Sequence, residues 1–291
     1  MKHTIMLAAA LALTACAPSG QTSHALAAPQ RMDEDSLIFT RTITRARLEH
    51  LDTLPIGEVI ARVGKWFVGT PYTPYTLEEA GPEHLVINLR TFDCQTFLEN
   101  MLAFGRVIKM ERADFATFKR ELTRLRYRDG KLAGYPSRLH YFSEWIANND
   151  AKGIARNLTP ELGVVDAEPI DFMSTHRAAY KALAGNDAFM AQIQAMEKRI
   201  SAVPRYMIPE DRIAALESKI HNGDLIAMTS SLKGLDVAHT GLALWVAGRL
   251  HLMHAPLVGD SVEISAKPLA DRVIALATQD GIMVARPLEP R

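Results

Sequence analysis

Apolar residues recur at helical spacing through much of the first half of the chain. Between Ile43 and Phe67 they stand three or four positions apart, which predicts a helical segment. The following stretch to Asp93 is rich in Gly and Pro, which predicts a loop with one short strand at Leu85–Leu89. A second apolar face begins after Cys94 and continues to Ile108, and a third runs through Phe115–Leu125. Helices are therefore expected in these segments.

The pattern changes after about residue 110. Residues 110–216 are mostly polar and amphipathic with helical periodicity, which predicts a large helical insertion. The last third instead contains short β-rich runs separated by Gly, Asp and Pro, including "GDLIAMTS", "HTGLALWV", "RLHLMHAP" and "GIMVARPL". Helices followed by strands predict an α+β fold with an antiparallel sheet. "HTGLALWV" is apolar on both faces and is predicted to be a central strand, joined to the next by a hairpin at residues 247–249.

The amino terminus is typical of an exported protein. "MKHTIMLAAALALTACAPSG" has Lys2, an apolar run too short to cross about 30 Å of hydrocarbon, and then small residues. Residues 13–16 resemble a bacterial lipoprotein cleavage box, so we expect a signal peptide over 1–15, lipid on Cys16 and a lipidated tether over 16–37. Ala17 favours the outer membrane, facing the periplasm. The alternative is an ordinary signal peptide with a chance cysteine.

Composition and charge exclude some functions. Hydrophobic residues make up 48% and charged residues 23% of the chain, as in ordinary globular proteins, and the formal net charge is +0. The balanced charge gives no electrostatic reason to bind nucleic acid, which is not expected as a partner. After the amino terminus, no segment is apolar enough to span a membrane.

Cys94 is one of two cysteines in the sequence. If Cys16 carries lipid, Cys94 has no disulfide partner within the chain, so it is a buried filler, a link between molecules or a reactive thiol. It lies in the first turn of a predicted helix, and Asp93 can cap that helix through the amide of Gln95 or Thr96. The helix terminus predicts a lowered thiol pKa, and the free Cys94 amide could bind an oxyanion.

A cysteine nucleophile needs a base, and the base needs an orienting group. His239 begins the predicted central strand, and His254 ends the neighbouring one, so the two can meet across a hairpin. His251 should face the opposite way from His254. The alternatives are a structural role for His239, or a metal site made of the three histidines, for which no carboxylate stands at ligand spacing. No metal or cofactor is expected.

Six segments together resemble the N-acetylmuramoyl-L-alanine amidase-like family, a branch of the NlpC-type papain-like cell-wall hydrolases. They are "VGTPYTPYTLE", "LVINLRTFDCQTFLENMLA", "SRLHYF", "NGDLIAM", "GLDVAHTGLAL" and "LMHA". The resemblance implies that residues 38–291 form a papain-like core with an antiparallel sheet, a catalytic helix on its N-terminal side and the helical insertion. It also implies peptidoglycan or muropeptide fragments as partners.

The resemblance further implies individual roles. Cys94 would be the nucleophile, His239 the base and then the acid, and His254 the group that orients His239. Tyr72 would lie beside the cysteine and help to hold the oxyanion, unless it only packs in its loop. The substrate-binding candidates are Ser137, Arg138, His140 and Tyr141. The alternative is that Ser137 caps a helix and that Arg138 is exposed to solvent.

Three functions follow in order of preference. The first is hydrolysis of the bond between N-acetylmuramic acid and L-alanine through Cys94. The second is an NlpC-type endopeptidase that cuts between γ-D-glutamate and the diamino acid. The third, from another class, is a cell-wall-binding lipoprotein without activity.

Two aspartates near the predicted strands are expected to be structural. Asp224 and Asp236 are interpreted as turn and loop residues.

Overall fold

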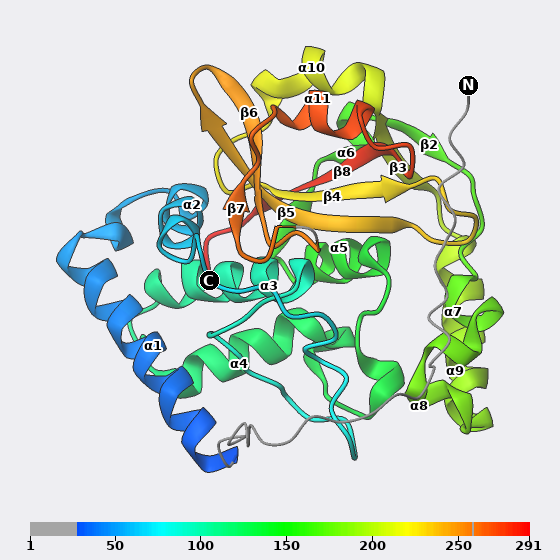
Figure 1. Ribbon diagram of the computed structural model, residues 1–291, viewed down its shortest axis with the longest axis horizontal. Helices are drawn as coiled ribbons and strands as arrows, with labels where there is room; N and C mark the ends of the chain where they lie inside the picture. The colour runs from blue at the N-terminus through cyan, green and yellow to red at the C-terminus, as the bar shows by residue number, and fades with distance from the viewer. Residues whose placement is uncertain (1–27, 258) are drawn as a thin grey trace, which may run out of the picture.

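A computed structural model describes residues 28–257 and 259–291, so the predicted signal peptide and Cys16 lie outside the described residues (Figure 1). The helices follow the capping and periodicity of the sequence, and none in this part of the chain is long and apolar enough to cross a membrane. Their bounds are α1 Ala28–Leu48, α2 Ile56–Trp66, α3 Cys94–Ile108, α4 Phe115–Arg126, α5 Phe142–Ala151, α6 Thr159–Leu162, α7 Phe172–Thr175, α8 Lys181–Ala184, α9 Asp187–Ser201, α10 Ile213–Leu216 and α11 Leu269–Ile274.

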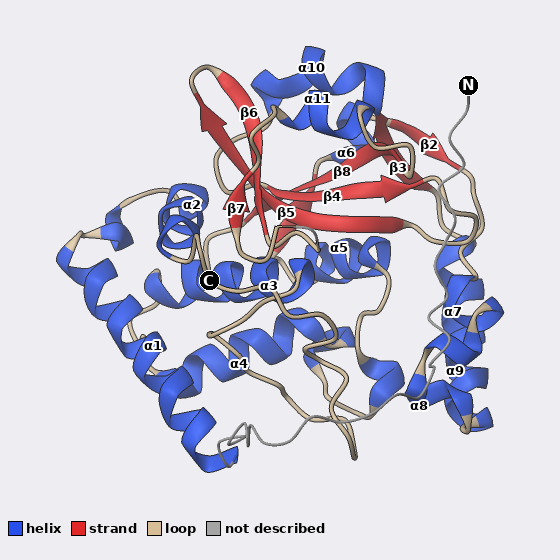
Figure 2. Cartoon of the chain, in the orientation of Figure 1, coloured by secondary structure: helices blue, strands red, loops and turns tan. Residues whose placement is uncertain are grey.

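One antiparallel sheet of eight strands holds the second half together (Figure 2). Its order is β2-β3-β8-β4-β5-β6-β7, with β1 paired to β8, and every pairing is antiparallel. The strands are β1 Ala155–Asn157, β2 Val164–Asp166, β3 Arg205–Pro209, β4 Leu225–Ser230, β5 Val237–Val246, β6 Arg249–His254, β7 Glu263–Ile264 and β8 Gln279–Pro287.

The sheet is covered on both faces, which explains why its central strands are apolar on both sides. Helices α2 and α3 pack below it and α10 and α11 above it in Figure 1. Along β4 the side chains alternate: Leu225 and Ala227 join the core with α2 and α3, whereas Ile226 and Met228 join the core with α11. The predicted α+β class, the central position of β5 and the hairpin after it are confirmed.

The hairpin between β5 and β6 fixes the register of the two strands. Ala247 and Gly248 both have positive φ, 47° and 81°, as a two-residue turn between paired strands requires. Val246 pairs with Arg249, and Leu242 pairs with Met253. This register brings the beginning of β5 close to the end of β6, where the two candidate histidines stand.

Several predicted boundaries are wrong. The helical segment over 43–67 divides into α1 and α2, because residues 49–55 include Pro55 and a short 3-10 turn. Residues 85–89 form no strand. Helix α1 covers residues 28–37 of the predicted tether, and Asp35 there is buried and accepts a hydrogen bond from the Leu89 amide.

The insertion is less uniformly helical than predicted. It contributes β1, β2 and β3 to one side of the sheet. The part from α7 to α9 forms a small apolar cluster of its own, in which Met173, Leu183 and Ile193 are buried with Tyr141. This cluster stands at one end of the sheet (Figure 1). The insertion is therefore joined to both the sheet and the helical layer.

Candidate active site

Cys94 is held at the first position of α3 by a complete capping box. Asp93 Oδ1 accepts a hydrogen bond from the Thr96 amide at 2.7 Å, and Thr96 Oγ1 accepts one from the Asp93 amide at 3.0 Å. Thr76 in the preceding loop donates to Asp93 Oδ2 at 2.8 Å. The predicted cap is therefore confirmed, and it fixes the direction in which the Cys94 side chain leaves the helix.

A cavity of about 250 Å³ brings together Cys94, His239 and three of the four substrate-binding candidates, whereas Tyr72, Ser137 and His254 are not among its lining residues. Cys94 and Gln95 of α3 form one side, and His239 and Thr240 of β5 form another. The insertion closes the cavity with residues such as Met173 of α7. Other residues that line the cavity include Glu99, Arg126, Arg138, His140, Tyr141 and Asp236.

His239 and His254 form a hydrogen-bonded pair across β5 and β6. His239 Nε2 lies 2.7 Å from His254 Nδ1, and the two rings are nearly perpendicular. Burial, followed by the positive charge of Arg272, lowers the pKa of His239 to about 4. Burial, followed by His239 and Arg272, lowers the pKa of His254 to about 2. Both rings are therefore neutral near pH 7, and the bond leaves His239 Nδ1 available to another group.

The prediction of a lowered thiol pKa is wrong. Burial and then the Asp93 carboxylate raise the pKa of Cys94 to about 11, and the hydrogen-bonding groups of Thr240 and Gln95 offset part of this rise. The helix terminus still favours an anion, but the residue that caps it places a negative charge beside the sulfur. Near pH 7, Cys94 is therefore a thiol that needs a base.

Tyr72 lies near the thiol, as the resemblance implies. Its amide donates to Asp260 O at 2.8 Å and it forms a bridge with Phe92, so two neighbouring segments hold its loop. Burial, and then the negative charges that Cys94 and Asp93 carry when ionised, raise the pKa of Tyr72 to about 12. The hydroxyl group therefore remains protonated and can donate a hydrogen bond.

The four substrate-binding candidates are mostly engaged within the protein. Ser137 Oγ donates to Gly134 O at 2.6 Å and so closes a turn. The Arg138 guanidinium makes its bidentate contact with Glu83, at 3.0 and 2.6 Å, and also binds Glu78. Arg138 is therefore not free to make a bidentate contact with a substrate carboxylate, because Glu83 occupies both of its donors. The contact between Arg138 and Glu83 anchors the loop between α2 and α3.

Tyr141 and His140 also have protein partners. The Tyr141 hydroxyl donates to Glu197 and accepts from the Met173 amide, both at 2.8 Å, which ties α9 and α7 together. His140 Nε2 lies 2.9 Å from Tyr135 O, and burial lowers the pKa of His140 to about 3. His140 is thus a neutral ring on the cavity wall, and Tyr141 is a structural link between the cavity and the insertion.

Asp224 and Asp236 hold backbone elements in place. Asp224 accepts from the His221 amide at 2.8 Å and pairs with Arg286, as expected of a turn residue. Asp236 is buried rather than an exposed loop residue. It accepts from the amides of Ser143 and Val237, and so links α5 to the start of β5.

Three residues around the thiol were missed in the sequence. Thr240 is buried beside the Cys94 sulfur, and its position directly after His239 could have indicated it. Glu99 and Arg126 form a buried ion pair of 2.7 Å that lines the cavity. No sequence signal marks this pair, because each residue lies on an amphipathic helix where a charged residue is usually exposed.

The three-histidine alternative does not fit the geometry. His251 Nδ1 lies 2.8 Å from Ser265 O, on the opposite side of β6 from His254. Within residues 28–257 and 259–291, no three residues among His, Cys, Asp and Glu are grouped so that they could hold a metal ion.

Fold and site together define an α+β protein in which a thiol at a helix start and a histidine on an antiparallel sheet share one cavity, and a second, buried histidine is hydrogen-bonded to the first. The family model described as "AmiA-like: N-acetylmuramoyl-L-alanine amidase-like" matches residues 62–281. The chain belongs to this amidase-like family of peptidoglycan hydrolases. The resemblance noted in the sequence is thereby confirmed.

Solved structures agree with this assignment. An N-acetylmuramoyl-L-alanine amidase from Bacteroides uniformis is 33% identical with a TM-score of 0.77, over 80% of this chain and 99% of that one. A Bacteroides fragilis protein, provisionally named as a xylanase, is 37% identical with a TM-score of 0.74, over 77% and 98% of the two chains. A Legionella pneumophila protein, 17% identical with a TM-score of 0.66, shares the fold over 90% and 98%. No curated protein matches the sequence.

Proposed function

We propose that this protein hydrolyses the amide bond between N-acetylmuramic acid and L-alanine in peptidoglycan, with Cys94 as nucleophile. The observation that carries the proposal is the shared cavity: Cys94 and His239 line it together, and His239 is hydrogen-bonded to the buried His254 behind it, in a chain of the amidase-like family. We also propose that α3 and the sheet correspond to the papain-like core of NlpC-type enzymes.

The first half of the reaction forms an acyl-enzyme. Because Cys94 is protonated and His239 is neutral near pH 7, His239 takes the thiol proton as the sulfur attacks the carbonyl carbon. The carbonyl oxygen becomes an oxyanion, which the Cys94 amide and the Tyr72 hydroxyl stabilise. The C–N bond then breaks, protonated His239 gives its proton to the leaving amine, and the lactyl group remains as a thioester on Cys94.

The second half releases the acyl group. With the peptide amine gone, water enters and His239 removes a proton as the water oxygen attacks the thioester. The C–S bond breaks, the Cys94 sulfur regains a proton from His239, and the lactyl carboxylate leaves. His254 keeps the His239 ring oriented in both halves through the 2.7 Å contact.

Two other reactions have less support than hydrolysis of the muramoyl–alanine bond. The same thiol and histidines could cut between γ-D-glutamate and the diamino acid, but the matching family is named for the muramoyl–alanine bond. Glycoside hydrolysis, suggested by the name of the Bacteroides fragilis relative, needs a pair of free carboxyl groups. In the cavity, Glu99 is paired with Arg126, and Asp236 is bonded to two amides. A non-catalytic role gives no reason for a thiol and a histidine to line the same cavity.

We also propose that the protein is a lipoprotein anchored through Cys16, on the outer membrane and facing the periplasm. The support is the sequence at residues 13–16. Such an anchor would place the cavity next to the cell wall. Growth with a labelled fatty acid should transfer label to the wild-type protein and none to Cys16→Ala, whereas equal labelling of both would contradict the anchor.

The experiment that tests the proposed function is digestion of purified peptidoglycan followed by mass analysis. The expected products are free stem peptides that begin with L-alanine and glycans with an intact lactyl group. Cys94→Ala should release neither, with its thermal midpoint compared with wild type as the folding control. New amino termini on the diamino acid would instead identify an endopeptidase, and undiminished digestion by Cys94→Ala would exclude Cys94 as the nucleophile.

A further inference from the structure

The cavity contains a buried cation with one unused hydrogen-bonding group. Arg126, at the end of α4, is 1% exposed. Its Nε donates to Glu99 Oε2 at 2.7 Å, and its Nη1 donates to Val86 O at 2.6 Å. Arg126 Nη2 is buried and has no hydrogen-bond partner among the described residues. A buried, unpaired guanidinium nitrogen costs free energy unless a ligand supplies the acceptor.

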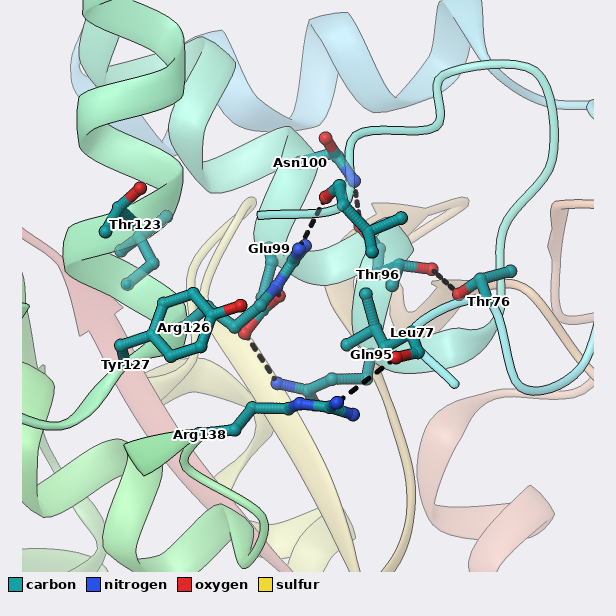
Figure 3. Close-up of polar contacts among 12 residues, drawn as sticks. Thr76, Leu77, Gln95, Thr96, Glu99, Asn100, Thr123, Arg126, Tyr127 and Arg138 are labelled. Carbon is teal, nitrogen blue, oxygen red and sulfur yellow. Dashed lines mark hydrogen bonds and ion pairs between the residues drawn. The ribbon is translucent and has the colours of Figure 1, made fainter. Parts of the chain in front are cut away.

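The neighbours of Arg126 cannot supply that acceptor. Glu99 Oε1 already accepts from Gln95 Nε2 at 3.2 Å (Figure 3). It also accepts from Trp145 Nε1 at 3.0 Å, and Glu99 Oε2 accepts from Arg126 Nε. The Glu99 carboxylate is thus held by three donors and cannot turn toward Nη2. The ion pair fixes the guanidinium in place, and Arg126 is one of the residues that line the cavity together with Cys94.

The pairing of Arg126 with Glu99 of α3 indicates which part of a substrate could reach it. Glu99 stands five positions after Cys94, which is about 7.5 Å along the helix axis. Two extended residues of a peptide span about 7 Å. In a muramoyl peptide cut at the lactyl–alanine bond, the second stem residue is D-glutamate, linked through its γ-carboxyl group, and it carries a free α-carboxylate.

We propose that Arg126 is a specificity-determining residue whose Nη2 binds the free α-carboxylate of the second stem residue. This inference rests on the proposed function and names the substrate group that the same site recognises. A carboxylate supplies both the acceptor that Nη2 lacks and the charge that a buried guanidinium favours. The enzyme should therefore distinguish stems with a free carboxylate from stems in which this group is amidated.

The test uses two small substrates that differ at one group: N-acetylmuramoyl-L-alanyl-D-glutamic acid, with a free α-carboxylate, and N-acetylmuramoyl-L-alanyl-D-isoglutamine, in which that carboxylate is an amide. Wild-type kcat/KM for the acid should exceed that for the amide by about 10- to 100-fold, as expected for a hydrogen bond to a charged group. Arg126→Lys keeps a cation for Glu99 but lacks the Nη2 donor, so the ratio should fall toward one. Arg126→Ala is less suitable, because it leaves Glu99 buried without a counter-charge.

A matched control comes from the same helix. Arg124 pairs with Glu121, has a side chain 42% exposed and does not line the cavity, so Arg124→Lys should keep the wild-type ratio. Thermal midpoints of both variants report on folding. Equal rates on acid and amide in wild type, or an unchanged ratio in Arg126→Lys, would overturn the role of Arg126 alone. Failure of wild type to cut either substrate would overturn the proposed bond, and the inference with it.

Discussion

His239 Nε2 and His254 Nδ1 lie 2.7 Å apart on adjacent strands, and the His254 side chain is fully buried. His254 Nε2 makes no hydrogen bond among the described residues, but the Glu263 carboxylate oxygen Oε1 lies 3.5 Å away, and its negative charge favours a proton on that nitrogen. His254 Nδ1 is then an acceptor, and His239 Nε2–H is the donor. This tautomer leaves the lone pair on His239 Nδ1, which is what a base acting on Cys94 requires.

Replacement of His254 tests that relationship. His254→Ala should lower kcat by about 10²- to 10⁴-fold, because His239 loses the partner that fixes its tautomer. His254→Asn should retain more activity, since its amide oxygen can accept from His239 Nε2–H. Steady-state kinetics on muropeptides, with thermal unfolding of each variant, measures both effects. If the Ala and Asn variants fold and have equal activity, the orienting role of His254 is excluded.

Glu263 offers a milder change to the same chain of contacts. Glu263→Gln keeps the size of the side chain but removes the negative charge near His254 Nε2. The preference for the tautomer should weaken, and kcat should fall less than in His254→Ala. A larger loss in Glu263→Gln than in His254→Ala would show that Glu263 acts in some other way.

Thr240 is expected to control the reactivity of the thiol. Its amide and its hydroxyl group both lower the pKa of Cys94, against the larger effects of burial and Asp93, and the buried hydroxyl makes no hydrogen bond to any other described residue. Thr240→Val removes the hydroxyl group with little change in volume, so the pKa of Cys94 should rise further above 11. Alkylation by iodoacetamide, followed from pH 7 to 11, should be slower in Thr240→Val than in wild type, and Thr240→Ser should behave like wild type. Identical rates in wild type and Thr240→Val would assign no such role to the hydroxyl.

The central strands and the histidine pair could both be predicted from the sequence, because both depend on the apolar pattern of the strands and on the hairpin between them. Strands buried on both faces, such as β4 and β5, are long apolar runs, and the hairpin after Val246 fixes which residues face each other. Strands β1 and β2 have three residues each, too few to show a period of two. They depend on pairing with β8 and β3, which the local sequence does not encode.

Electrostatic properties were predicted less well than geometry. The capping box at Asp93 follows from residue types, but the direction of the Cys94 pKa shift depends on burial, which only the folded chain shows. Arg138 has the residue type of a substrate ligand, yet Glu83 and Glu78 bind it. These glutamates are more than 50 positions away in sequence, so the pairing could not be anticipated from the local motif.

The low pKa of His239 predicts the acidic limit of activity. His239 can act as a base only when neutral, and its pKa of about 4 lies below the ordinary value of 6.5 because of burial. For the free enzyme, kcat/KM should therefore stay nearly constant as pH falls to about 5 and decline only near pH 4. A pH profile on a small muropeptide measures this limit. A decline centred near 6.5 would mean that His239 is far better solvated than its position indicates.

His140 should make the fold sensitive to acid. Its pKa is about 3 in the folded chain and about 6.5 when unfolded, so below pH 6.5 the unfolded chain takes up a proton that the folded chain does not. The free energy of unfolding should therefore fall as pH falls from 6.5 toward 3. His140→Gln can keep a donor for Tyr135 O and should make this fall shallower. Urea unfolding at several pH values gives the slopes, and equal slopes for the two proteins would rule out a contribution from His140.

Gly105 determines how closely α2 approaches the helix that carries Cys94. A Cβ at Gly105 would lie 2.4 Å from Ile60 Cγ1, and Ile60 is fully buried. Overpacking costs about 1–3 kcal/mol, and the better helix propensity of alanine returns about 1 kcal/mol. Gly105→Ala should therefore lower the free energy of unfolding by up to about 2 kcal/mol, as measured by urea denaturation.

The chain supplies both a control and a compensating change for Gly105→Ala. Gly185 has negative φ, and no described atom lies within 4 Å of a Cβ built there, so Gly185→Ala should stay within about 0.5 kcal/mol of wild type. Ile60→Ala removes the atoms that the new methyl group would meet. In the double variant with Gly105→Ala, the loss should therefore be smaller than the sum of the two single losses. Strict additivity would show that the cost of Gly105→Ala arises elsewhere than at the contact between α2 and α3.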